Sequence, residues 1–414
     1  MSWFAMLFAA GMGIGLMFWS VAEPVAYLNG QWYGTPLGVE AGSEEARHMA
    51  MGATMYHWGL HPWAIYAVVA LSLAFFSYNK GMPLTIRSAF YPILGERCWG
   101  WPGHIIDTLA VVATIFGLAT SLGLGAQQAS GGLHFLFDTP NAINVQIAII
   151  FGVTAVAVIS VMRGLDGGVK ILSNINMTLA LFLLLFVIIA GPTLLIITGF
   201  GTTAVDYLSN IVPLSNWIGR EDDAGFHGWT VFYWAWWISW SPFVGMFIAR
   251  ISKGRTVREF ITAVLLVPTI ITIIWMSAFG GSGLNQAING VGELAGGISD
   301  ASLALFQMLE NMPFTSIMSF LGIVLVLVFF VTSSDSGSLV IDSITAGGKL
   351  DAPVPQRVFW AVMEGVIAGA LLYGGGKEAL KALQSGAVAT GLPFTFVLLL
   401  MCVSLYMGLS AESK

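Results

Sequence analysis

Charged residues are scarce in this sequence of 414 amino acids. Asp, Glu, Lys and Arg make up only 9% of it, while hydrophobic residues make up 57%. A soluble domain carries about 25% charged residues, so an ordinary soluble protein is excluded. No run of Lys and Arg is dense enough for nucleic acid or for an anionic lipid surface, so we expect a lipid bilayer and no nucleic acid as partners. The composition indicates an integral membrane protein.

Cysteine is almost absent as well. Cys98 and Cys402 lie far apart, and neither belongs to a cluster with metal-ligand spacing, which excludes a disulfide framework and a zinc site. The first apolar segment has no basic flank and no small-residue cleavage site, so it does not read as a signal peptide. No nucleophile, base and orienting residue group together at usable spacing, and we therefore predict that the protein is not an enzyme.

Long apolar runs are what the sequence has in abundance. Their lengths fit the span of about 20 residues that crosses a bilayer. We expect an all-α polytopic membrane protein with about ten transmembrane helices. The expected spans are 3–28, 50–78, 104–130, 142–162, 171–199, 229–249, 259–280, 315–340, 357–374 and 389–409.

The loops between these spans differ in positive charge. One set of loops holds twelve of the Lys and Arg residues, and the other set holds only Arg47, Arg220, Lys377 and Lys381. Positive residues accumulate on the cytoplasmic side of a membrane. Both termini are therefore predicted to be cytoplasmic.

Residues 200–228 are too polar to span and read as an amphipathic helix at the outer surface. This connector divides the chain into a first five-helix repeat, 1–199, and a second, 229–414. Two halves with odd helix numbers and opposite orientation are typical of inverted-repeat transporters, whose substrate site lies near the midplane.

Aromatic residues concentrate in the segment from Trp229 to Pro242, which contains no charged residue. At helical spacing Tyr233, Trp236, Trp237 and Trp240 share one face. The faces of such rings attract a quaternary ammonium or sulfonium group that offers no hydrogen-bond donors. The alternative interpretation is an aromatic belt at the membrane surface. Trp237 argues against it, because it lies about 12 Å into the helix at about 1.5 Å per residue.

A second aromatic group lies on the span 50–78, where Trp58, Trp63 and Tyr66 fall on an arc that can curve round a small cationic head. His57 and His61 are four residues apart, but Trp58 stands where a zinc-protease helix would have Glu, so metal binding is not expected.

The first span contains three glycines in five residues, from Gly11 to Gly15. Each glycine weakens a helix by about 1 kcal/mol, and such a stretch in a transporter often marks an unwound segment that lines a site. A glycine face for close helix packing is the alternative. Glu23, next to Pro24, is expected near the outer end of this helix in a structural role.

Five stretches together resemble the betaine/choline/carnitine transporter family. They are GMGIGLMFWSVAEP from Gly11, HWGLHPWAIY from His57, ATIFGLATSLGLGAQQ from Ala113, the tryptophan segment continuing to Phe260, and FFVTSSDSG from Phe329. The resemblance runs through nearly every expected span. It implies a LeuT-like core of two inverted five-helix repeats, a bacterial inner-membrane location, and secondary transport of betaine-like zwitterions, usually by a homotrimer.

The resemblance also implies which residues bind the substrate. It assigns an aromatic box to Trp58, Trp63, Tyr66 and Trp237, with Trp236 and Trp240 beside it. Met12 and Ser121 would lie close to the substrate, and Trp234 would pack elsewhere.

Sodium is the coupling ion that the resemblance implies, and no other cofactor is expected. Its site maps to Ala9, Met12, Phe329, Thr332 and Ser333, whose carbonyl and hydroxyl oxygens suit a hard cation. A second sodium site would use Thr114 and Phe243. Its companion hydroxyl is replaced here by Leu118, which puts that site in doubt.

Two positions favour sodium-coupled transport of a zwitterion within this family. Proton-coupled choline carriers tend to have Asp where this chain has Gly15, and sodium-independent exchangers of carnitine-like compounds place an arginine on the third core helix. No Arg occurs here between Arg97 and Arg163. Proton-coupled choline transport and sodium-independent exchange remain alternatives, as does a nontransporting receptor or inactive fragment. Family members usually have two helices before the glycine-broken one, so we expect a truncated form, and one of those helices helps to form the trimer.

Overall fold

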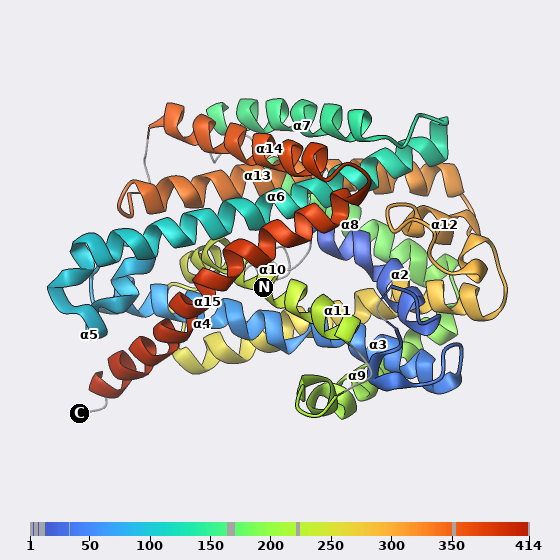
Figure 1. Cartoon of the computed structure of the whole chain (residues 1–414), viewed down its shortest axis with the longest axis horizontal. Helices are drawn as coiled ribbons and strands as arrows, with labels where there is room; N and C mark the ends of the chain where they lie inside the picture. The colour runs from blue at the N-terminus through green and yellow to red at the C-terminus, as the bar shows by residue number, and fades with distance from the viewer. Residues whose placement is uncertain are drawn as a thin grey trace.

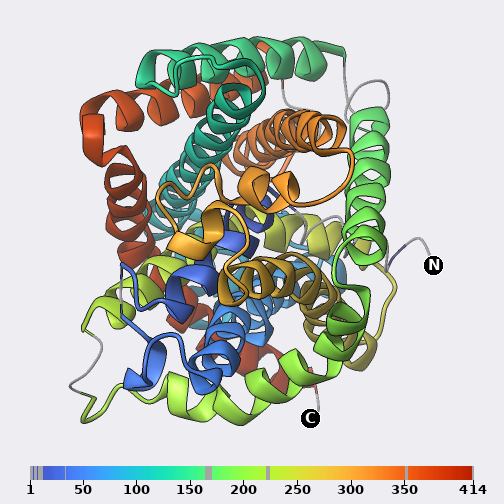
Figure 2. The same ribbon diagram turned by 90° about the vertical axis from the view of Figure 1, so that its right-hand side faces the viewer.

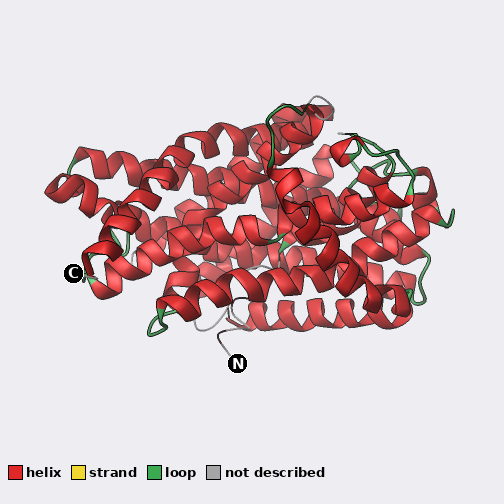
Figure 3. Ribbon diagram, turned by 90° about the horizontal axis from the view of Figure 1, so that it is seen from below, coloured by secondary structure: helices red, strands yellow, loops and turns green. Residues whose placement is uncertain are grey.

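The computed structural model describes residues 3, 7, 13–32, 34–163, 170–220, 224–349 and 353–412. Helices and the loops between them account for these residues, and no strand occurs among them (Figure 3). Eight helical segments of the described chain are long and apolar enough to cross a membrane, and two of these, Glu44–Asn79 and Val354–Glu412, contain successive helices. The prediction of an all-α polytopic membrane protein is confirmed.

The elements carry the labels of Figure 1. The α-helices are α2 Ile14–Leu28, α3 Glu44–Trp58, α4 Leu60–Ala74, α5 Tyr91–Leu94, α6 Trp101–Phe137, α7 Ile143–Arg163, α8 Lys170–Ala190, α9 Thr193–Ser215, α10 Ala224–Ile251, α11 Val257–Ile288, α12 Ala304–Glu310, α13 Thr315–Thr345, α14 Val354–Gly375 and α15 Ala379–Glu412. Short 3₁₀ or π segments are Pro36–Gly38, Phe75–Asn79, Ile86–Phe90, Gly95–Trp99, Glu293–Gly296 and Gly376–Glu378.

The long helices form two packed groups that meet at α6 and α10. In one group α6, α7, α13 and α14 pack against one another, and they lie along one side of the molecule in Figure 1. In the other group α10 packs against α4, and α2 packs against α3 and α11. Helices from both halves of the sequence occur in each group, so contacts between distant segments build the interface.

The expected span 50–78 differs from the structure in two ways. Helix α3 begins earlier, at Glu44, where the Ser43 hydroxyl accepts a hydrogen bond from the Ala46 amide at 3.0 Å. The helix then breaks at Gly59, which separates α3 from α4. A Cβ at Gly59 would lie 2.7 Å from the Tyr207 hydroxyl, which instead accepts a hydrogen bond from the Leu60 amide at 2.8 Å. The break lies directly after Trp58 of the predicted box.

The helix predicted at the surface begins earlier than expected, and by length and composition it is one of the eight segments that could cross a membrane. Helix α8 ends at Ala190, Gly191 and Pro192 follow, and α9 starts at Thr193 rather than at residue 200. Proline cannot continue the preceding helix, which explains the boundary. Helix α9 lies across the long helices rather than along them (Figure 2). The division of the chain at 200–228 into two repeats stays a prediction.

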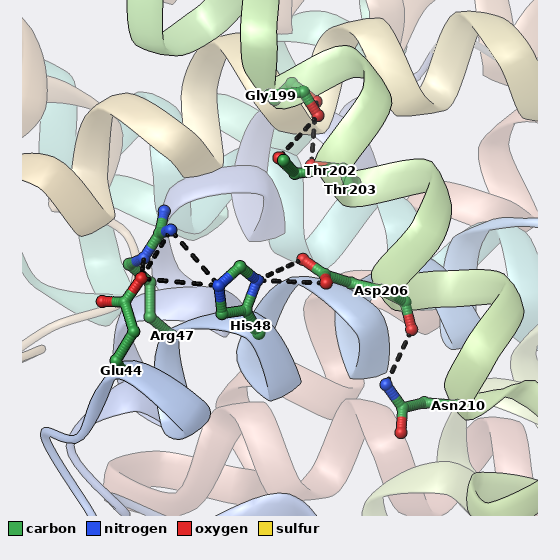
Figure 4. A network of polar contacts seen from close by, with 9 residues as sticks. Glu44, Arg47, His48, Gly199, Thr202, Thr203, Asp206 and Asn210 are labelled. Atoms are coloured by element: carbon green, nitrogen blue, oxygen red, sulfur yellow. Dashed lines mark hydrogen bonds and ion pairs between the residues drawn. The ribbon is translucent and has the colours of Figure 1, made fainter.

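A polar network fastens α9 to α3. His48 Nδ1 lies 2.9 Å from Asp206 Oδ2, and Arg47 lies 2.8 Å from Glu44 on the same helix (Figure 4). These groups are partly exposed, so each pair contributes at most about 1 kcal/mol. Their main effect is to fix where α9 crosses α3.

The first span is described from Gly13 onward. Gly13 is extended, with φ −168° and ψ −175°, and α2 starts at the next residue. The expectation of a helix over 3–28 is therefore wrong at Gly13, where the glycine stretch interrupts it. The predicted site residues Ala9 and Met12 lie outside the described residues.

Candidate substrate site

Every predicted substrate residue that the structure describes lines one cavity. The cavity among these side chains has a volume of about 40 Å³, below the roughly 300–1,000 Å³ usual for small-ligand pockets, so the rings pack closely around it. The lining residues are Gly13, Gly15, Leu16, Trp58, Pro62, Trp63, Tyr66, Ser121, Trp236, Trp237, Trp240 and Thr272. The remaining predicted residue, Met12, is not described. The rings surround a space inside the protein, so an aromatic belt is excluded.

The rings of the cavity are held at steep angles to one another. Trp58 and Trp237 are 4.8 Å apart at 73°, and Trp63 and Tyr66 are 5.4 Å apart at 81°. Trp236 is stacked on Trp237 at 4.8 Å. Edge-to-face packing presents ring faces from several directions to one small volume. Such a box suits a compact cation without hydrogen-bond donors.

Three indole N–H groups of the cavity rings have hydrogen-bond partners within the protein. Trp237 Nε1 donates to the His57 carbonyl at 2.9 Å, beside the break at Gly59. Trp236 Nε1 donates to Ser121 Oγ at 3.2 Å, and Trp58 Nε1 donates to Glu23 Oε2 at 3.0 Å. Because these three donors are satisfied within the protein, Trp58, Trp236 and Trp237 present mainly their π surfaces to the cavity.

Tyr233 is the exception on the predicted aromatic face. It does not line the cavity, and its ring lies behind Trp58, Trp236 and Trp237 at 5.6 to 6.1 Å. Its hydroxyl donates to Glu23 Oε2 at 2.5 Å. Trp234 packs against Tyr56 and His61, as expected. Sequence reasoning missed Leu16, Pro62 and Thr272; Leu16 and Pro62 lie within the stretches GMGIGLMFWSVAEP and HWGLHPWAIY but were not singled out there.

The N-terminus of α2 completes the cavity. Gly13, Gly15 and Leu16 line it, and the first N–H groups of a helix have no partner within that helix. This end also carries the positive pole of the helix dipole. The cavity therefore combines π surfaces that attract a cation with a helix end that attracts an anion.

Gly15 leaves room for two of the indoles. A Cβ at this position would lie 2.7 Å from the edge of Trp58 and 2.8 Å from the edge of Trp236. We expect Gly15→Ala to weaken substrate binding about tenfold, because displacing packed rings costs about 1–3 kcal/mol. Equilibrium binding of labelled substrate to the purified protein measures this, with Gly152→Ala as control, since a Cβ there meets nothing within 4 Å. Equal affinity in Gly15→Ala and the unchanged protein would contradict the expectation.

A second cavity contains the described part of the predicted sodium site. Phe329, Thr332 and Ser333 of α13 line it. The other lining residues are Ser173, Asn176, Met177, Trp240, Phe243, Val244, Phe247 and Ser336. Trp240 lines both cavities, so one indole separates the two spaces.

Not all oxygen atoms that line the second cavity have a hydrogen-bond partner among the described residues. Thr332 Oγ1 donates to the Val328 carbonyl at 3.0 Å and accepts a hydrogen bond from Asn176 Nδ2 at 3.5 Å, which leaves one of its lone pairs available. Among the described residues, no hydrogen-bond partner reaches Asn176 Oδ1. Thr114, predicted for a second sodium site with Phe243, donates to the Ala110 carbonyl at 2.7 Å and does not line this cavity.

The fold is that of a LeuT-like membrane transporter. A manganese transporter variant from Eremococcus coleocola superposes with a TM-score of 0.53 at 13% identity, over 98% of this chain and 78% of that chain. At this identity the likeness concerns the fold alone.

The sequence comparisons define the family. The model described as "BCCT, betaine/carnitine/choline family transporter" matches residues 1–414, and the chain belongs to this family. Glycine betaine transporter 1 of Vibrio parahaemolyticus is 68% identical over 100% of this chain and 79% of the relative. The glycine betaine transporter OpuD of Bacillus subtilis is 45% identical over 100% of this chain and 80% of the relative. The protein is thus a transporter and not an enzyme, as predicted.

Proposed function

We propose that the protein is a sodium-coupled symporter of a betaine-like zwitterion. The observation that carries this proposal is the cavity lined by Trp58, Trp63, Tyr66, Trp236, Trp237 and Trp240. This chain covers 79% and 80% of the length of two relatives that are named for glycine betaine. A trimethylammonium or dimethylsulfonium head would lie against the rings by cation–π attraction.

The carboxylate of the zwitterion would bind at the start of α2. Gly13 and Gly15 at the start of α2 line the cavity, and a helix N-terminus is a general anion site. Trp240 Nε1 is a further donor, because it is buried and has no partner among the described residues. Ser121 and the undescribed Met12 complete the proposed substrate site.

Sodium would bind in the second cavity. Oxygens of Phe329, Thr332 and Ser333, which line this cavity, would be ligands, and Ala9 and Met12 are the proposed partners from the first span. A further ion at Thr114 and Phe243 stays a prediction. Trp240 borders both cavities, so an ion that orders its side chain also shapes the box. Mutual improvement of the two affinities is what coupling requires.

The remaining topology follows from the loop charges. We propose that both termini are cytoplasmic in a bacterial inner membrane and that the protein assembles as a homotrimer. The segments 1–199 and 229–414 would form the two inverted repeats, and 200–228 would connect them at the outer face. Transport would proceed by alternating access to a site between the two helix groups.

Uptake of labelled glycine betaine by proteoliposomes tests the coupling. With a tenfold inward sodium gradient, we expect accumulation of about tenfold per coupled ion, because each tenfold gradient supplies about 1.4 kcal/mol. Without a gradient the solute should only equilibrate. Equal uptake in both conditions would reject sodium coupling. Counterflow without any ion gradient would favour an exchanger, and uptake that follows a proton gradient would favour a choline carrier.

A further inference from the structure

Glu23 is a buried carboxylate at the centre of a hydrogen-bond network behind the aromatic box. Its exposed fraction is 1%, and it lies within α2. Trp58 Nε1 and the Tyr233 hydroxyl donate to Oε2 at 3.0 and 2.5 Å. The Tyr27 hydroxyl donates to Oε1 at 3.1 Å, His57 Nδ1 lies 2.7 Å from it, and Trp229 Nε1 donates to it at 3.4 Å. One carboxylate thus connects α2, α3 and α10.

Two of these partners, Trp58 and Tyr233, connect Glu23 to the cavity: Trp58 forms part of its wall, and Tyr233 lies behind that wall. Trp58 lines the cavity, and its indole meets Trp237 edge to face at 4.8 Å. Tyr233 lies 5.6 Å from Trp58 and 5.9 Å from Trp237. The carboxylate therefore acts on the rings that would contact the substrate, although it does not line the cavity itself.

Helix α2 holds the Trp58 indole at both ends. Glu23 accepts a hydrogen bond from its Nε1, and the missing side chain of Gly15 leaves space for its opposite edge, which would lie 2.7 Å from a Cβ there. The orientation of this ring thus depends on where α2 sits against α3. A hydrogen bond from an indole N–H to a carboxylate also shifts electron density onto the ring, which strengthens its attraction for a cation.

We infer that Glu23 is a positioning residue of the transport site, which holds the Trp58 indole and the Tyr233 phenol in the arrangement that binds an onium group. This inference rests on the proposed function. It differs from a purely structural role, because removing the charge should weaken substrate binding in protein that still folds.

The test compares Glu23→Gln and Glu23→Asp in purified, reconstituted protein. We expect Glu23→Gln to raise the Kd for labelled glycine betaine about tenfold and to leave the maximal rate within about twofold, because the charge-assisted hydrogen bonds to Trp58 and Tyr233 are weakened. Glu23→Asp keeps the charge with a shorter reach and should recover part of the affinity. A Kd unchanged in Glu23→Gln, or a loss of rate alone, would overturn the inference.

A double-mutant cycle with Trp58→Phe shows whether the effect passes through the indole. In the Trp58→Phe background the N–H is absent, so Glu23→Gln should change the Kd by less than about threefold. Additive effects would contradict a role through Trp58. Should Glu23→Gln not fold, Tyr233→Phe keeps the ring and removes only the hydroxyl, and we expect about a threefold higher Kd. An unchanged Kd in that variant would also overturn the inference.

Tyr27→Phe is the matched control, since it removes one bond to the same carboxylate without touching a box ring. Its Kd should stay within about twofold of the unchanged protein. A rise equal to that of Glu23→Gln would mean that the network only stabilises the fold. If Trp237→Leu lowers binding while Glu23→Gln does not, the inference alone fails. If neither changes binding, the proposed function fails as well.

Discussion

Replacing Trp237 with leucine will weaken the binding of glycine betaine about 100-fold. The substitution removes a ring face worth about 1–2 kcal/mol to a bound onium group. It also leaves the His57 carbonyl without the indole donor that lies 2.9 Å away, and it removes the stacking partner of Trp236. A buried acceptor without its donor adds about 1–3 kcal/mol. Equilibrium binding and uptake in proteoliposomes measure the effect.

Trp101→Leu is the control for this experiment. Trp101, at the start of α6, is also a tryptophan in a long helix, but its side chain is 74% exposed and lies outside both cavities. Binding and uptake should be unchanged in this variant. Undiminished accumulation in Trp237→Leu would show that the aromatic cavity is not the substrate site.

Replacing Thr332 and Ser333 together with alanine will strongly weaken the stimulation of transport by sodium. Both residues line the second cavity, and both would contribute hydroxyl oxygens to a hard cation. Loss of two oxygen ligands should raise the sodium concentration for half-maximal uptake at least about 30-fold, equivalent to about 2 kcal/mol. Uptake measured as a function of sodium concentration gives this value directly.

Thr345→Ala on the same helix serves as the comparison. Its hydroxyl donates to the Ile341 carbonyl at 2.8 Å near the end of α13, and it does not line the second cavity. The sodium dependence should match that of the unchanged protein. If the Thr332 and Ser333 double variant also keeps its sodium response, the ion binds elsewhere.

Much of the site was predictable because helical spacing within a short segment determines which of its side chains share one face. The spacing of Trp236, Trp237 and Trp240 puts three indoles on one side of α10, and the structure finds all three at the cavity. The same rule placed Tyr233 on that face, yet its ring lies behind the others. A helical face spans a wide arc, and only the neighbouring helices decide which part of it reaches a cavity.

The role of Glu23 could not be read from its surroundings in the sequence. Next to Pro24 it looked like a residue at a helix end, whereas its partners include Tyr233, 210 positions away along the chain. Asn176 was missed for the same reason, since its part in the second cavity depends on how α8 packs against α13. Contacts between distant segments have no local pattern.

The amino-acid sequence alone determined that the chain crosses a membrane through helices, where its aromatic residues concentrate and which family it resembles, because hydropathy, helical period and motif spacing are properties of neighbouring residues. The tertiary structure alone decided that α3 and α4 break at Gly59, that Trp240 separates the two cavities and that Glu23 holds the box from behind. These features arise where helices from both halves of the chain meet, and close packing in three dimensions sets them.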